Sequence, residues 1–218
     1  YAPLAAEIAD AGFFVTIQQA PLGLAILDSD MAQASIDAFP GIDTWAVGGH
    51  SLGGAMAARF ASESDQVDGL VLLAAYPEGG LDLRDSGLEV ISIYADRDLL
   101  ATPDDVLGSQ PRLPADTEFV LIEGGNHAQF GAYGKQPRDG EASIPASESR
   151  ASVRARPSAR SAPASWSSWA SVRTTPKPLC ATSLSTIEFA VAVSARTMPT
   201  PLDPDTVLDL TTLSWAAR

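Results

Sequence analysis

Blocks of apolar and polar residues alternate along the first 143 residues and predict helices and strands in turn. Apolar residues at helical spacing predict an opening helix over 2–11, whereas short, uninterrupted apolar runs predict buried strands. Asp28 or Ser29 can cap a second helix, and Pro103 fits the first turn of a short one. The predicted strands cover residues 13–17, 44–47, 67–75, 89–94 and 117–122. The second helix is expected to end near residue 39, and one further helix covers residues 55 to about 63.

Strands that are apolar throughout and alternate with helices are typical of a mostly parallel sheet with helices on both faces. We therefore expect an α/β fold. The pattern stops near residue 143, and residues 144–218 are rich in serine, alanine and proline. We expect this second segment to be irregular or disordered. Its short apolar run over 189–193 is either an extra strand or an aggregation-prone sequence.

Charge and cysteine content exclude several classes of function. The 218 residues have a formal net charge of −13, and 22 of the 27 acidic residues precede residue 146. Such an acidic domain is poorly suited to binding nucleic acid or an anionic membrane. The single cysteine, Cys180, excludes a disulfide framework and a cysteine-rich zinc site, and we expect no metal or organic cofactor. No signal peptide is visible, and no apolar run is long enough for a membrane span.

A Gly-His-Ser-Leu-Gly sequence at residues 49–53 lies between a predicted strand and a predicted helix. G-x-S-x-G at such a turn is typical of a nucleophilic serine in a strained, exposed conformation. Ser51 is therefore the candidate nucleophile. The N–H of Leu52, at the start of the helix, is a candidate oxyanion donor. We expect His50 to be structural, with its side chain pointing away from that of Ser51.

A serine nucleophile needs a base, and the base needs an orienting carboxylate. His127 is the only histidine after Ser51 and follows the last predicted strand. Asp98 follows the preceding strand, so the chain order is Ser, Asp, His, as in one class of catalytic triads. Asp96 is the alternative acid. Three other polar residues either line the substrate pocket or are ordinary loop residues: Asn126, Gln129 and Tyr133.

Residues 48–54, 92–98 and 123–131 resemble the α/β-hydrolase superfamily, in particular its small, single-domain, esterase-like branch. The resemblance implies a serine hydrolase that cleaves a carboxylic ester or thioester through an acyl-enzyme. The family's acid loop usually has a glycine where this chain has Ala95, and this comparison favours Asp98 as the acid.

Two departures from the family pattern accompany the resemblance. Family members have a strand and an oxyanion loop before the helix at 2–11, and that strand lies between the strands equivalent to 13–17 and 44–47. They also have a long amphipathic helix after the histidine loop. We expect both to be missing, so that residues 1–143 form an incomplete domain, truncated at the N-terminus. Our hypothesis is that residues 144–218 are the translation of a shifted reading frame or an unrelated fusion.

Three functions are compatible with these observations: a serine hydrolase acting on a small ester, a catalytically inactive fragment of such an enzyme, and a non-enzymatic α/β binding module. The intact Ser, Asp, His order favours the hydrolase. No insertion long enough to form a lid lies between residues 75 and 98, and a small substrate is therefore expected.

Overall fold

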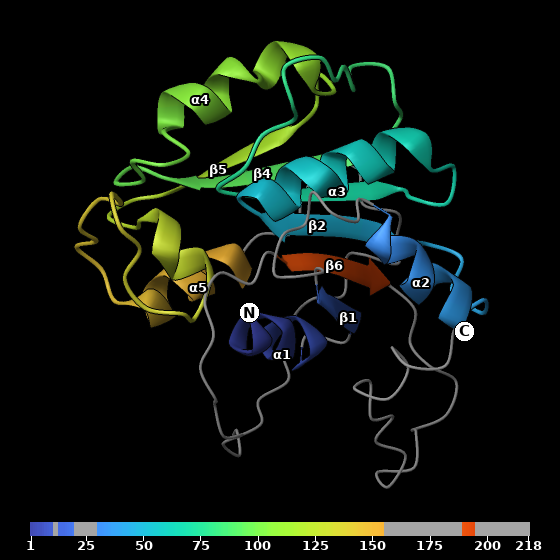
Figure 1. Ribbon diagram of the computed structural model, residues 1–218, viewed down its shortest axis with the longest axis horizontal. Helices are drawn as coiled ribbons and strands as arrows, with labels where there is room; N and C mark the ends of the chain where they lie inside the picture. Colours follow the sequence, from blue (N-terminus) through green and yellow to red (C-terminus); the bar gives the residue numbers. More distant parts are fainter. Residues whose placement is uncertain (11–12, 20–29, 155–188, 195–218) are drawn as a thin grey trace, which may run out of the picture.

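One mixed β-sheet, with helices on both faces, organises the part of the protein that the structure describes (Figure 1). The computed structural model describes residues 1–10, 13–19, 30–154 and 189–194. The strand order is β1-β6-β2-β3-β4-β5, in which β2 to β5 are parallel to one another. This confirms the predicted α/β class with a mostly parallel sheet.

The elements follow the predicted alternation closely. The strands are β1 (Phe14–Gln19), β2 (Ala46–His50), β3 (Gly69–Leu73), β4 (Glu89–Ala95), β5 (Glu118–Ile122) and β6 (Phe189–Ser194). The α-helices are α1 (Ala2–Asp10), α2 (Met31–Ala38), α3 (Leu52–Glu63), α4 (Pro103–Gly108) and α5 (Ala146–Arg154). Two 3₁₀ helices are η3 (Gln110–Arg112) and η4 (His127–Phe130). The predicted caps Asp28 and Ser29 lie outside the described residues. No helix in the described ranges is long and apolar enough to cross a membrane.

Alternate residues of the strands pack into two hydrophobic layers, one on each face of the sheet. On β3, Leu70 and Leu72 pack with residues of α2 and α3, and α3 crosses in front of the sheet in Figure 1. Leu73, from the same strand, packs on the other face with Leu4 of α1 and with Phe130 of η4. Because successive side chains of a strand point to opposite faces, an apolar run fills both layers.

The strand before the serine is longer than predicted. We expected it to end at residue 47, but β2 continues through Gly48 and Gly49 to His50. A Cβ atom added to Gly48 would lie only 2.7 Å from the carbonyl oxygen of Val71 on β3. The glycine therefore allows β2 to pair closely with β3 up to the turn. As a result, α3 begins immediately after Ser51.

The apolar run near residue 190 fills the position of the strand that we expected to be missing. β6 pairs antiparallel with β1 on one side and with β2 on the other, and Val191 lies opposite both Ile17 and Gly48. Without an occupant at this position, β1 and β2 would each present an unpaired edge. β6 therefore takes the position of the family strand that is missing from the sequence before α1, and the extra-strand interpretation of this run is confirmed.

A helix after residue 144 is a second difference from the expected irregular segment. In α5, Val153 packs against the hydrophobic layer that contains Leu4, and Arg150 lies 3.5 Å from the carboxylate of Glu7 on α1. These contacts with distant residues stabilise a helix that lacks a long apolar stripe. α5 and β6 are thus regular elements within a segment that we expect to be irregular or disordered. The domain boundary at residue 143 stays a prediction, and the reading-frame change stays a hypothesis.

Substituting Val191 with proline tests whether β6 completes the sheet. Proline removes a backbone N–H from a strand that is paired on both sides. We expect Val191→Pro to lower the free energy of unfolding by at least about 1–3 kcal/mol, the usual cost of leaving a buried partner unsatisfied. Urea denaturation followed by circular dichroism measures this change. Val191→Thr, which keeps the N–H and the branched Cβ, is the control and should lose less. An unchanged urea midpoint in Val191→Pro would contradict the pairing.

Candidate active site

Ser51 occupies a strained turn between β2 and α3. Its backbone torsion angles are φ 57° and ψ −128°, a conformation that costs a non-glycine residue about 1–3 kcal/mol. The Ser51 N–H donates to the carbonyl oxygen of Leu73 at 3.0 Å, which ties the turn to the end of β3. A side chain at Gly54 would collide with Ala75 and with the Gly49 carbonyl, so this glycine allows α3 to approach the sheet. These contacts maintain the conformation that G-x-S-x-G predicts.

Leu52 is the first residue of α3. Its N–H therefore has no acceptor within the helix and lies at the positive end of the helix dipole. This position is suitable for a donor to a developing oxyanion next to Ser51, as predicted from the sequence.

Asp98 and His127 form a buried pair at the carboxyl ends of β4 and β5. The Asp98 Oδ2 atom lies 2.7 Å from His127 Nδ1, and the two side chains are 0% and 1% exposed. The other oxygen, Oδ1, accepts the N–H groups of Leu100 and Ala101, each at 2.8 Å. Because a carboxylate accepts hydrogen bonds, the proton of a neutral His127 belongs on Nδ1, and Nε2 has a free lone pair.

The structure distinguishes between the two candidate acids. Asp96 accepts the N–H of Gly124 at 2.6 Å and does not contact the histidine, whereas Asp98 pairs with it. Ala95, which replaces the usual glycine of the family, is fully buried. Its Cβ lies 3.3 Å from the position that a Cβ on Gly125 would occupy. Because Gly125 has no side chain, the methyl group of Ala95 fits beside it. The loop therefore brings Asp98 to His127 even though Ala95 replaces the family's glycine.

Asp139 holds the backbone around His127, a role that the sequence analysis missed. Its carboxylate accepts the N–H groups of His127 at 3.2 Å and Ala128 at 2.9 Å. It also accepts the N–H of Gly140 at 2.8 Å. These bonds satisfy the free N–H groups at the start of η4. No local motif reveals this role, because it depends on how the loop after η4 folds back.

His50 lies against His127, with the centroids of their rings 4.4 Å apart. Its side chain is 2% exposed, and its Nδ1 is 2.7 Å from the hydroxyl of Tyr1. Burial, together with the neighbouring His127, lowers the pKa of His50 well below the ordinary value of 6.5. His50 therefore stays uncharged beside the candidate base. The predicted structural role agrees with its burial, but the contact with His127 was not foreseen.

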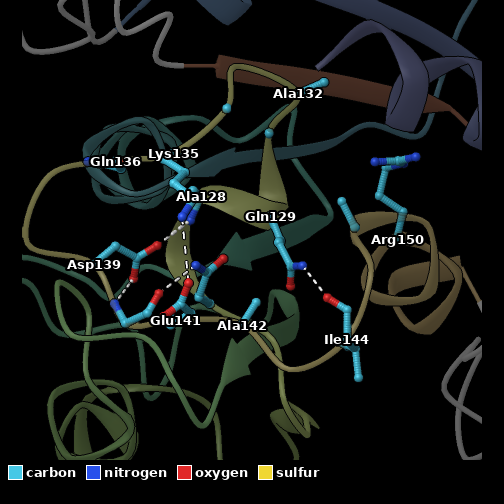
Figure 2. Close-up of a pocket in the computed structure, with 15 residues that line it drawn as sticks. Ala128, Gln129, Ala132, Lys135, Gln136, Asp139, Glu141, Ala142, Ile144 and Arg150 are labelled. Carbon is cyan, nitrogen blue, oxygen red and sulfur yellow. Dashed lines mark hydrogen bonds and ion pairs between the residues drawn. The ribbon is translucent and has the colours of Figure 1, made fainter.

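A cavity of about 690 Å³ lies beside the histidine loop, and its lining includes neither Ser51 nor His127. Asn126 and Gln129 line it, and Figure 2 shows the Gln129 amide donating to the Ile144 carbonyl. Tyr133 is instead close to His50, at 6.2 Å between ring centroids. Burial, and the negative charges of Asp139 and Asp98, raise the pKa of Tyr133.

The structure thus brings Asp98 and His127 into direct contact, but it does not join Ser51 to them by a hydrogen bond. Within the described residues, His127 Nε2 is buried and has no partner. Catalytic hydrogen bonds are often long or poorly aligned in the absence of substrate. Among the same residues, no three His, Cys, Asp or Glu side chains are grouped so that they could hold a metal ion.

Comparison with known proteins identifies the family. The sequence pattern of the alpha/beta hydrolase family matches residues 1–151, more than half of the chain. This chain belongs to the α/β hydrolase family. The match extends beyond residue 143 and includes most of α5, so the family pattern continues past the residue where we expect it to end.

Other comparisons of this α/β hydrolase are more distant. A solved structure described as an alpha-beta serine hydrolase homologue from Coxiella burnetii is 19% identical, with a TM-score of 0.39. The match covers 50% of this chain and 54% of that chain, so the present sequence spans about half the length of that protein. No curated protein sequence matches this chain.

The uncharged state of His50 predicts how stability depends on pH. The pKa of His50 is lowered by folding, so the unfolded chain binds more protons below about pH 6.5, and stability falls as the pH decreases. The groups that act on His50 are the phenols of Tyr1 and Tyr133, the imidazole of His127 and the α-ammonium group of Tyr1. Between pH 7 and 5.5 we expect the wild type to lose about 1 kcal/mol more stability than His50→Phe, which has no ionisable group there. Urea denaturation at several pH values measures this difference, and parallel losses in the two proteins would contradict a neutral His50.

Proposed function

We propose that this α/β hydrolase is a serine hydrolase that cleaves a carboxylic ester or thioester bond of a small substrate. The observation that carries the proposal is the buried Asp98–His127 pair, which leaves Nε2 of the histidine without a partner. Burying a carboxylate and an imidazole in direct contact costs solvation free energy. Titratable groups buried in this way are common at functional sites. The ring of His50, the residue before Ser51, lies 4.4 Å from that of His127, and we assign the pair to general-base catalysis on this strained serine.

In the proposed reaction, the Ser51 oxygen forms a bond with the carbonyl carbon, and its proton passes to His127 Nε2. The Leu52 N–H donates to the oxyanion. Collapse of the tetrahedral intermediate breaks the bond to the leaving group, which receives the proton from His127. A water molecule then attacks the acyl carbon and gives a proton to His127. The bond to the Ser51 oxygen breaks, the carboxylic acid is released, and His127 returns the proton to the serine. Asp98 keeps the proton on Nδ1 and stabilises the imidazolium that forms in each step.

The proposed small substrate is supported by the connection between β3 and β4. Residues 74–88 contain no helix. Leu83, within this connection, is buried in the hydrophobic layer between the sheet and helices α2 and α3. The Leu83 N–H also donates to the Arg112 carbonyl at 2.7 Å. This connection therefore packs against the body of the domain, and it does not form a separate lid over Ser51.

Labelling with a fluorophosphonate tests the proposed function on the full chain. This reagent modifies a serine only when a base activates its hydroxyl. We expect one adduct, at Ser51, and none in Ser51→Ala or His127→Ala. Mass spectrometry of the digested protein identifies the modified residue.

The two neighbouring acids supply a matched pair of variants for the same assay. Asp98→Asn should slow labelling by up to about 10⁴-fold, the loss seen when a triad acid is neutralised, because the wrong imidazole nitrogen then carries the proton. Asp96→Asn, on the same loop but bonded to Gly124, should have a much smaller effect. A folded wild-type chain that does not react would favour the inactive fragment or the binding module. Equal rates for the two Asn variants would contradict the role of Asp98.

A further inference from the structure

The contact between His50 and His127 has no role in the reaction proposed above. His50 ends β2, immediately before the nucleophile, whereas His127 follows β5. Their ring centroids lie 4.4 Å apart, with an angle of 47° between the ring planes. The Asp98 carboxylate holds one edge of the His127 imidazole through Nδ1. His50 contacts the same ring from a different element of the sheet.

His50 is itself held firmly. Its ring stacks on Phe130 of η4, with 5.7 Å between centroids and 19° between planes. Its Nδ1 is bonded to the Tyr1 hydroxyl at 2.7 Å, whereas its Nε2 is buried and has no hydrogen-bond partner within the described residues. A buried imidazole nitrogen without a partner costs free energy that an apolar ring of similar shape would not. We therefore attribute the role of His50 to the position and shape of its ring and not to hydrogen bonds from its nitrogens.

The charge state of His50 is compatible with a partner that becomes positive during the reaction. Burial, together with the proximity of His127, lowers its pKa, so that it remains neutral. A protonated His50, with its ring centroid 4.4 Å from that of His127, would repel an imidazolium on His127, whereas a neutral His50 does not. The other groups that act on His50 are the phenols of Tyr1 and Tyr133 and the α-ammonium group of Tyr1, whose positive charge also lowers the pKa of His50.

We propose that His50 is a positioning residue: its ring is the surface against which the His127 imidazole is held in line with the Asp98 carboxylate. The catalytic value of that alignment rests on the proposed function. The alignment itself does not, because it can be measured without a substrate. It also assigns the role to the flat ring and not to the ring nitrogens. Replacement by another flat ring should therefore preserve the alignment, whereas truncation should destroy it.

The experiment compares the full-length wild type with His50→Ala and His50→Phe by proton NMR and by the rate of fluorophosphonate labelling at Ser51. The His127 Nδ1 proton, bonded to Asp98 and shielded from solvent, gives a low-field signal that reports the alignment directly. In His50→Ala we expect this signal to be lost through exchange with water. The labelling rate should fall about 10- to 100-fold, as for other small misplacements of a catalytic group. In His50→Phe the signal should remain, and the rate should stay within about threefold, because a similar ring packs in the same place.

Val67→Ala is the control for a general loss of stability. Val67 is buried in the other hydrophobic layer and precedes β3, so it lies at the opposite end of the sheet from His50. This variant should keep both the signal and the labelling rate. A folded His50→Ala protein with an unchanged signal would overturn the proposal, as would a His50→Phe protein that loses it. The low-field signal could be present in the wild type and His50→Phe and lost in His50→Ala while the wild type does not react with the fluorophosphonate. That result would support the positioning role and overturn the proposed function.

Discussion

The parallel alignment of β2, β4 and β5 is the constraint on which the candidate site depends. Parallel strands end at the same edge of a sheet, so the residues that follow them meet there. Ser51 follows β2, Asp98 lies just beyond β4, and His127 begins the short helix after β5. Backbone hydrogen bonds extend this order into the turns, as between Ser51 and Leu73. The chemistry of the site therefore follows from strand pairing, and a defect in the sheet would displace all three residues together.

The sheet in turn depends on residues from both ends of the chain. β6, from a segment whose composition differs from that of the rest, lies between β1 and β2 and runs antiparallel to both. Its apolar, β-branched sequence suits a strand with neighbours on both sides. α1 and α5 contribute to the hydrophobic layer that includes Phe130, next to His127. Segments that contribute no residue to the candidate site thus support η4, the element that carries the candidate base, His127.

The sequence predicts those features that depend on local pattern and on chain order. Apolar runs predict β3, β4 and β5, and the positions of their ends indicate Asp98 and His127 as candidates for the site. Pairings between distant residues are harder to predict from the sequence. The position of β6 depends on the space between β1 and β2, and α5 depends on contacts with α1. The interactions of Asp139 with the His127 backbone, and of His50 with its ring, arise from loop folding that no short motif encodes.

In the proposed mechanism, strand pairing assembles Ser51, His127 and Asp98 into one acyl-transfer site. The most direct measurement is the intact mass of the full chain after brief exposure to a p-nitrophenyl ester and quenching in acid, followed by peptide mapping. A working site forms an acyl-enzyme, so we expect a single acyl group, attached to Ser51, that disappears with time as water attacks. A folded chain that acquires no acyl group, or acquires it at another residue, would contradict the proposed triad.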